Sequence, residues 1–180
     1  MGNISNKPDI RISPNCKETS THTLALMRAV KETEGDVCEL GAGFSSTALL
    51  HWICQGRKLV TYENNPGYVH YARKFRTYNH KVKEVKDWNE VDFNRHWSVV
   101  FVDHTIGKRS WEKGLQRGDT AVQFKNADIL VMHDSEKPEH YHYDMVYPHY
   151  KYRFDWTECK PWTVVLSNVI DVSKWQNCRF

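Results

Sequence analysis

The sequence lacks the features that mark a membrane or secreted protein. It has no uninterrupted apolar run of about 18 residues, the length that a membrane-spanning helix needs. Its first residues, Met-Gly-Asn-Ile-Ser-Asn, do not follow the pattern of a secretory signal peptide. Asn6 stands where an N-myristoylation motif requires Ser or Thr. We therefore expect a cytoplasmic protein with no membrane partner.

The sequence also lacks any paired arrangement of cysteines. The five are odd in number and scattered, and none forms a Cys-x-x-Cys pair: Cys16, Cys38, Cys54, Cys159 and Cys178. This pattern indicates neither a disulfide framework nor a cysteine zinc site. We expect reduced thiols.

A strong excess of one charge is missing as well. Lys and Arg number 25 against 22 Asp and Glu, a net charge of +3, which is low for a dedicated nucleic-acid binder. The 180 residues, with 40% hydrophobic and 26% charged side chains, suit one globular domain. Residues 1–19 are polar and turn-rich and predict an N-terminal arm, so the domain is expected to span residues 20–180.

A glycine-rich turn lies between a strand pattern and a helix pattern. The apolar run 37–40 predicts a strand, and residues 46–53 predict a helix. The turn between them lets the backbone approach a ligand closely, and the first N–H groups of the helix offer a partly positive surface. The candidate ligand-binding residues here are Gly41, Ala42, Gly43, Ser45 and Ser46.

Two glutamates favour one class of ligand. Glu39, two places before Gly41, suits a cationic ligand better than a pyrophosphate. Glu63 ends the next predicted strand, where a carboxylate can accept hydrogen bonds from both hydroxyls of a ribose. Ser46 occupies the place of the third glycine in the dinucleotide fingerprint, so a nicotinamide enzyme is the less favoured alternative.

The segment Glu39-Leu40-Gly41-Ala42-Gly43 resembles the first motif of the class I S-adenosylmethionine (SAM)-dependent methyltransferases. The resemblance covers about residues 20–170. It implies an α/β fold, a Rossmann-like seven-stranded, mostly parallel sheet with helices on both faces and a C-terminal antiparallel hairpin. It also implies that the loop holds the amino-acid end of SAM, that Asp87 meets the adenine amino group, and that Trp88 flanks the adenine ring.

The patterns along the chain fit this architecture. Apolar and β-branched runs predict further strands at 58–62, 82–85, 98–102, 127–132, 153–156 and 162–166. Helical spacing and capping residues predict helices at 20–34 and 65–75, with a partly helical segment at 111–124.

Polar residues follow two neighbouring predicted strands. Asp103-His104 follow the strand at 98–102, and His133-Asp134-Ser135 follow the strand at 127–132. Because parallel strands lie about 4.8 Å apart and end at the same edge, Asp103 and Asp134 should face the same crevice as the glycine turn. The two carboxylates predict either a divalent-metal site or an acid/base site in which His104 or His133 takes a proton.

These strand ends look like those of the metal-dependent O-methyltransferases of the catechol type, which end in Asp-His and Asp-Asn. That resemblance implies Mg²⁺ or Mn²⁺ on Asp103, Asp134 and Ser135, with Ser135 in the place of the family's Asn. His133-Asp134 is also similar to the strand end of methyltransferases that modify sugars and other polyols.

The sequence thus predicts a SAM-dependent methyltransferase that modifies a hydroxyl of a small molecule or glycan, with or without a divalent metal. Two alternatives stay open: a nucleic-acid methyltransferase and a SAM-binding protein without turnover. Against the first, Asp103 is followed by His-Thr-Ile instead of the Pro-Pro-aromatic sequence of amino-group DNA methylases. The sequence leaves open whether the protein forms a homodimer.

Overall fold

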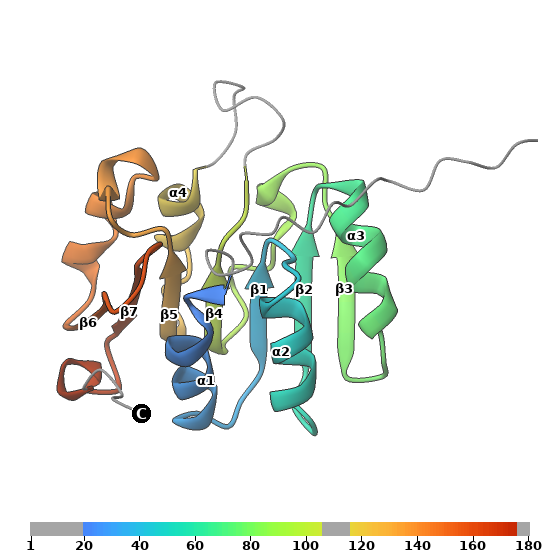
Figure 1. The fold of residues 1–180 in the computed structure, drawn as a ribbon, viewed down its shortest axis with the longest axis horizontal. Helices are drawn as coiled ribbons and strands as arrows, with labels where there is room; N and C mark the ends of the chain where they lie inside the picture. Colours follow the sequence, from blue (N-terminus) through green and yellow to red (C-terminus); the bar gives the residue numbers. More distant parts are fainter. Residues whose placement is uncertain (1–19, 106–115, 176–180) are drawn as a thin grey trace, which may run out of the picture.

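The computed structural model describes residues 20–105 and 116–175, which build one seven-stranded sheet in the order β3-β2-β1-β4-β5-β7-β6 (Figure 1). The predicted arm at 1–19 lies outside the described residues. The strands are β1 (Val37–Leu40), β2 (Leu59–Glu63), β3 (His80–Glu84), β4 (Trp97–Val102), β5 (Ala127–His133), β6 (Tyr152–Trp156) and β7 (Thr163–Ser167).

The first five strands run parallel, β7 runs in the opposite direction, and β6 runs in the same direction as the first five. β1 pairs with β2 on one side and with β4 on the other, and β5 extends the sheet beyond β4. β7 then lies antiparallel between β5 and β6, as the predicted C-terminal hairpin requires. The carboxyl ends of β1, β2, β4 and β5 consequently meet at one edge of the sheet.

Short helices connect these strands. They are α1 (Thr23–Lys31), α2 (Ser46–Ile53), α3 (Pro66–Ala72) and α4 (Arg117–Ala121), with 3₁₀ turns η2 (Arg73–Phe75), η3 (Trp88–Glu90), η4 (Pro138–His140), η5 (Tyr143–Met145), η6 (Tyr147–His149) and η7 (Val172–Lys174). Asn65 caps α3 by accepting the N–H of Gly67 at 2.9 Å, and Pro66 sits at its first position. The helix predicted at 65–75 consists of two elements: the α-helix α3 ends at Ala72, and the 3₁₀ turn η2 follows it directly.

Alternate side chains of the central strands pack on opposite faces of the sheet, because successive strand residues point to opposite sides. Val99 and Phe101 pack on the face covered by α1 and α2, where Leu26 and Leu50 are fully buried. Figure 1 shows α1, α2 and α3 on this face. Val100 and Val102 pack on the other face, whose cover is provided by residues of α4, η3, η5 and their flanking turns.

The predicted fold class is confirmed, with one difference in detail. The second face carries a helix of only five residues, α4, and several 3₁₀ turns in place of long helices. Of the predicted helical segment 111–124, the part before residue 116 lies outside the described residues. Within residues 20–105 and 116–175, no helix has the length and apolar character needed to cross a bilayer.

Close packing holds α4 against the segment that follows β5. The N–H of Gly118 donates to the carbonyl of Tyr141 at 2.7 Å. A Cβ atom at Gly118 would lie 2.1 Å from the carbonyl oxygen of His142, a backbone atom that cannot rotate away. Glycine at this position is therefore what allows α4, and Arg117 at its start, to approach the sheet.

Gly118→Ala should lower the free energy of unfolding by about 2 kcal/mol or more, because the new methyl group overpacks a backbone contact. Gly56→Ala is the control. Gly56, unlike the helical Gly118, has a left-handed conformation with φ of 82°, but nothing lies within 4 Å of its Cβ position. Gly56→Ala should lower the free energy of unfolding by only about 1 kcal/mol, through backbone strain. Urea unfolding measures both, and equal losses would contradict the packing argument.

Candidate active site

A pocket of about 420 Å³ opens at the carboxyl ends of β1, β2, β4 and β5. This volume is within the range of small-molecule sites, and the location is where parallel α/β sheets bind ligands. Its lining residues are His22, Gly41, Ala42, Gly43, Phe44, Ser46, Glu63, Asn65, Tyr68, Asp103, Thr105, His133, Asp134 and Pro161. The structure thus brings together most of the residues predicted for a ligand site.

The glycine turn forms one wall of this pocket. Gly41 has φ of 89°, a left-handed conformation that favours glycine. A Cβ atom there would lie 2.6 Å from the carbonyl oxygen of Asp103, so the turn packs directly on the end of β4. A Cβ atom at Gly43 would lie 2.8 Å from the hydroxyl of Ser46. Gly41 therefore has no room for a side chain, whereas a methyl group at Gly43 would require the Ser46 hydroxyl to shift. Ser45 is not among the lining residues.

Glu39 does not line the pocket. Its carboxylate is fully buried and accepts hydrogen bonds from the hydroxyls of Thr47, at 3.0 Å, and Thr61, at 2.6 Å. Thr47 in turn accepts the N–H of Gly43 at 3.0 Å. Burial raises the pKa of Glu39 from 4.5 to about 7. In this structure the carboxyl supports the glycine turn from behind, and the predicted ligand contact of Glu39 stays a prediction.

Glu63 lines the pocket, but most of its acceptor capacity is already used. Its carboxylate accepts the N–H groups of Ala42 at 2.6 Å, Asn64 at 2.8 Å and Asn65 at 2.6 Å. A carboxylate offers about four acceptor positions, so about one remains for a ligand. Glu63 therefore fastens the glycine turn to the end of β2, and its contact with a ribose stays a prediction.

The residues predicted to contact adenine lie outside the pocket lining. Asp87 caps η3 by accepting the N–H of Asn89 at 2.8 Å. Trp88 is buried, and its indole N–H donates to the carbonyl of Thr105 at 3.0 Å. Thr105, which accepts this hydrogen bond, lines the pocket, whereas Asp87 and Trp88 do not. The adenine contacts of Asp87 and Trp88 stay predictions.

His104 is directed away from the pocket. Its ring stacks on Trp88 at a centroid distance of 4.1 Å, and its Nε2 lies 2.7 Å from the hydroxyl of Thr120. Burial and the nearby Arg117 lower the pKa of His104 from 6.5 to about 3. The prediction that His104 takes a proton from a substrate is therefore corrected, because the side chain is buried on the far side of the strand end.

A buried guanidinium lies between the two predicted carboxylates. Arg117 is 5% exposed and contacts Asp103 at 2.9 Å through one terminal nitrogen and Asp134 at 2.7 Å through the other. Its Nε donates to the carbonyl of His104 at 2.7 Å. Burial alone would raise the pKa of Asp103, but Arg117 and His133 outweigh it and lower this pKa to about 2.

The predicted metal set of Asp103, Asp134 and Ser135 stays a prediction, which this arrangement does not favour. The cation that joins the two carboxylates is Arg117. Ser135 is buried and does not line the pocket, and its N–H donates to the carbonyl of Trp162. Asp134 itself remains at the pocket with φ of 58°, a left-handed conformation that Asp tolerates better than most residues.

His133 reaches the pocket from the end of β5 and has neighbours at both ring nitrogens. Its Nε2 lies 2.9 Å from the hydroxyl of Thr21. Its Nδ1 lies 3.4 Å from Asp103 Oδ1 and 3.6 Å from Asp134 Oδ1. Burial would lower the pKa of His133, but the two carboxylates, Asp103 foremost, raise it.

Three residues of this site have no distinctive signal in the sequence. Thr21 and His22 precede α1 and appear there only as part of a helix start. Arg117 belongs to a segment whose helical pattern is weak. They join the site through contacts between distant segments: His22 lines the pocket, Thr21 contacts His133, which is 112 positions away, and Arg117 contacts Asp103.

No protein-family model matches the sequence, and no curated protein matches it. Solved structures do match the fold. The N-methyltransferase NodS from Bradyrhizobium japonicum WM9 has a TM-score of 0.60 at 12% identity, covering 87% of this chain and 99% of that chain. Its complex with S-adenosyl-L-homocysteine has a TM-score of 0.58 at 13% identity and covers 91% of each chain.

Two further similar structures are methyltransferases of other kinds. A Staphylococcus aureus protein assigned as a caffeoyl-CoA O-methyltransferase has a TM-score of 0.57 at 10% identity over 82% of each chain. The METTL16 methyltransferase domain has a TM-score of 0.55 at 12% identity, over 82% of this chain and 68% of that chain. The chain therefore has the Rossmann-like fold of class I SAM-dependent methyltransferases. N- and O-methyltransferases share it, so the fold does not select an acceptor.

Glu39→Gln should change how stability depends on pH. A carboxyl with a higher pKa in the folded protein contributes stability that is complete below 4.5 and lost as the pH rises through about 7. Gln does not ionise, so Glu39→Gln should not lose this contribution as the pH rises. Between pH 4 and pH 8, the free energy of unfolding of the variant minus that of the wild type should increase by on the order of 3 kcal/mol. Denaturant unfolding across this range measures the gain.

Glu84→Gln is the matched control, since Glu84 is an exposed carboxyl at the end of β3 that pairs with Arg73. It reports the effect of losing one surface charge. A difference between Glu39→Gln and wild type that stayed constant with pH would refute the buried ionisation of Glu39.

Proposed function

We propose that the protein is a SAM-dependent methyltransferase that transfers a methyl group to a hydroxyl of a small molecule or glycan. The observation that carries this proposal is the pocket itself, in which a close-packed glycine turn faces carboxylates from two further strand ends, Glu63 and Asp103. Similarity to methyltransferase structures supports it.

The pocket residues suit the chemical groups of SAM. The backbone of the glycine turn lines the pocket through Gly41, Ala42 and Gly43, so a ligand can contact main-chain atoms there. Among the described residues, three carboxylates line the pocket, Glu63, Asp103 and Asp134, against one adjoining guanidinium, Arg117. This excess of negative charge favours a ligand that carries an ammonium and a sulfonium. A neutral or anionic cofactor would gain less from it.

The pocket also offers an acceptor side. Phe44 and Tyr68 line it with ring centroids 5.6 Å apart, and Pro161 and Asn65 add apolar and polar surface. Such a lining suits a sugar or aromatic acceptor, with Asn65 available to hydrogen-bond a hydroxyl.

When bound, SAM supplies a methyl group on a positively charged sulfur. The acceptor oxygen forms the new bond to carbon, the carbon–sulfur bond breaks with its electron pair going to sulfur, and the hydroxyl proton must be removed. Asp134 is placed for this step, since its Oδ2 binds Arg117 while Oδ1 faces His133 at the pocket. A positioned carboxylate of this kind contributes as a general base.

S-adenosylhomocysteine should bind the purified protein with a micromolar dissociation constant, measured by calorimetry, and NADH should not bind. Glu63→Ala should weaken this binding by more than about tenfold, because the carboxylate both holds the glycine turn and faces the pocket. Glu84→Ala is the matched control: Glu84 is the register neighbour of Glu63 on β3 and is exposed. Binding of NADH, or equal affinity in Glu63→Ala and wild type, would refute the cofactor assignment.

Asp134→Asn should lower turnover by about a hundredfold or more while leaving the affinity for S-adenosylhomocysteine within a few fold, since it removes a base and keeps the side-chain shape. Asn also tolerates the left-handed backbone of this position. Asp144→Asn, at an exposed site in η5, is the control. Formation of S-adenosylhomocysteine is measured with sugars, catechols and RNA as acceptors.

Unchanged turnover in Asp134→Asn would refute its role as a base. Turnover with RNA alone would instead support the nucleic-acid alternative. Binding of S-adenosylhomocysteine with no turnover on any acceptor would support a binding protein.

A further inference from the structure

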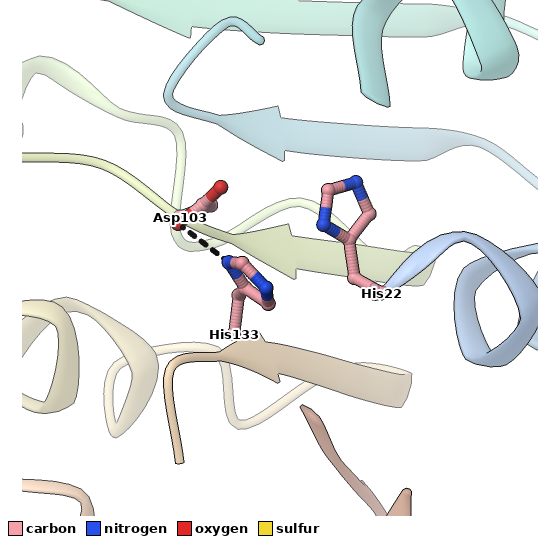
Figure 2. A group of neighbouring side chains, drawn as sticks. All are labelled: His22, Asp103 and His133. Atoms are coloured by element: carbon pink, nitrogen blue, oxygen red, sulfur yellow. Dashed lines mark hydrogen bonds and ion pairs between the residues drawn. The ribbon is translucent and has the colours of Figure 1, made fainter. Parts of the chain in front are cut away.

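Two histidines and one carboxylate converge in the pocket from three separate elements. His22 precedes α1, Asp103 follows β4, and His133 ends β5. Figure 2 shows the ring of His22 facing the Asp103–His133 pair across a shared space. One ligand atom from each side chain can be chosen so that all three lie within 4.8 Å of one another.

The hydrogen bonds of Thr21 determine which nitrogen of His133 carries a proton. The hydroxyl of Thr21 donates its single proton to the carbonyl of Pro161 at 2.6 Å. It can therefore only accept from His133, which places a proton on Nε2. In the neutral ring, Nδ1 then has a lone pair that points toward the carboxylate oxygens of Asp103 and Asp134, both of which are also acceptors.

An acceptor nitrogen facing two acceptor oxygens is unfavourable unless a cation lies between them. A second proton on His133 is one such cation, and a metal ion is the other. The separation between His133 Nδ1 and Asp103 Oδ1, 3.4 Å, is long for a hydrogen bond to a carboxylate. It equals the ligand–ligand distance of about 3.4 Å in a tetrahedral site whose bonds are about 2.1 Å long.

His22 distinguishes between these two cations. Its side chain is 1% exposed and lines the pocket, and within the described part of the chain neither ring nitrogen has a hydrogen-bond partner. Burying an imidazole without a partner is costly. A proton on His133 leaves that cost in place. A metal ion in the shared space would use a nitrogen of His22 as a ligand and remove it.

Charge balance points the same way. Asp103 and Asp134 contribute two negative charges near the cluster, and Arg117 returns one positive charge. With both imidazoles neutral, one negative charge is left over. Arg117 and His133 both contact Oδ1 of Asp103. Among the described residues, none hydrogen-bonds Oδ2 of Asp103, so this oxygen is available as a ligand.

We propose that His22, Asp103 and His133 form a binding site for a first-row transition-metal ion such as Zn²⁺. Two imidazole nitrogens and one carboxylate favour such an ion over Mg²⁺, which prefers oxygen ligands. Three protein ligands leave a position open toward the pocket. An ion there would lower the pKa of a hydroxyl that binds it. The proposal goes beyond the methyltransferase assignment, since it depends only on side chains of the ligand-free protein.

His22→Phe tests the site directly. It keeps an aromatic ring between Phe101, whose centroid is 4.7 Å from that of His22, and His133, at 4.8 Å, but removes both nitrogens. His149→Phe, the same change at an exposed histidine of η6, is the control. The full-length proteins are freed of metal with a chelator and titrated with Zn²⁺ by calorimetry and with Co²⁺ by visible absorption, with Mg²⁺ in parallel.

The wild type should bind one equivalent of Zn²⁺, and the Co²⁺ spectrum should show nitrogen and oxygen ligands in a low-coordinate site. His22→Phe should weaken binding by more than about tenfold, while His149→Phe changes it by less than about twofold. Without metal, His22→Phe should melt at the same temperature as wild type or higher, because no hydrogen bond is lost. Zn²⁺ should raise the melting temperature of wild type and His149→Phe only.

Equal Zn²⁺ affinity in His22→Phe and wild type would overturn the proposal, as would a wild type that binds no Zn²⁺ or that prefers Mg²⁺. Should His22→Phe fail to fold, His22→Gln serves in its place. Calorimetry with S-adenosylhomocysteine on the metal-free wild type separates the two assignments, because loss of the metal site leaves that titration unchanged.

Discussion

The pocket depends on the buried ion network around Arg117. A guanidinium with little access to water is stable only when its charge is paired and its N–H groups are satisfied, and here two carboxylates and two backbone carbonyls do both. The network fixes the ends of β4 and β5 relative to α4. The positive charge of Arg117 also offsets the repulsion between the carboxylates of Asp103 and Asp134, which it holds side by side at the mouth of the sheet.

The strand ends could be predicted because their signals are local. Apolar runs that end in a glycine or a carboxylate define β1, β2, β4 and β5, and parallel pairing then requires their ends to meet. The roles of individual side chains were harder to predict. Glu39 was interpreted as a ligand contact, yet its neighbour across the β1–β2 register is Thr61, which gives the carboxyl a partner inside the protein. Register, unlike the glycine motif, depends on the whole sheet.

The rest of the site could not be predicted because it is built from contacts between distant segments. Arg117, Thr21 and His22 have no motif in common, and each becomes significant only through a neighbour that the fold supplies. His104 illustrates the opposite case. It follows Asp103 directly, but successive residues point to opposite sides of a strand, so the fold buries it against Trp88 while Asp103 faces the pocket.

The position of β7 between β5 and β6 has a consequence for synthesis on the ribosome. The strand β5 acquires its second neighbour only from residues 163–167, which follow β6 in the sequence. Until that segment emerges, the nascent protein presents an apolar strand, Ala127–His133, with an unpaired edge. The wall of the pocket closes in the same late step, since Pro161 and Thr21 are separated by 140 positions. The pocket of a growing chain is therefore incomplete until residues 161–167 have been made.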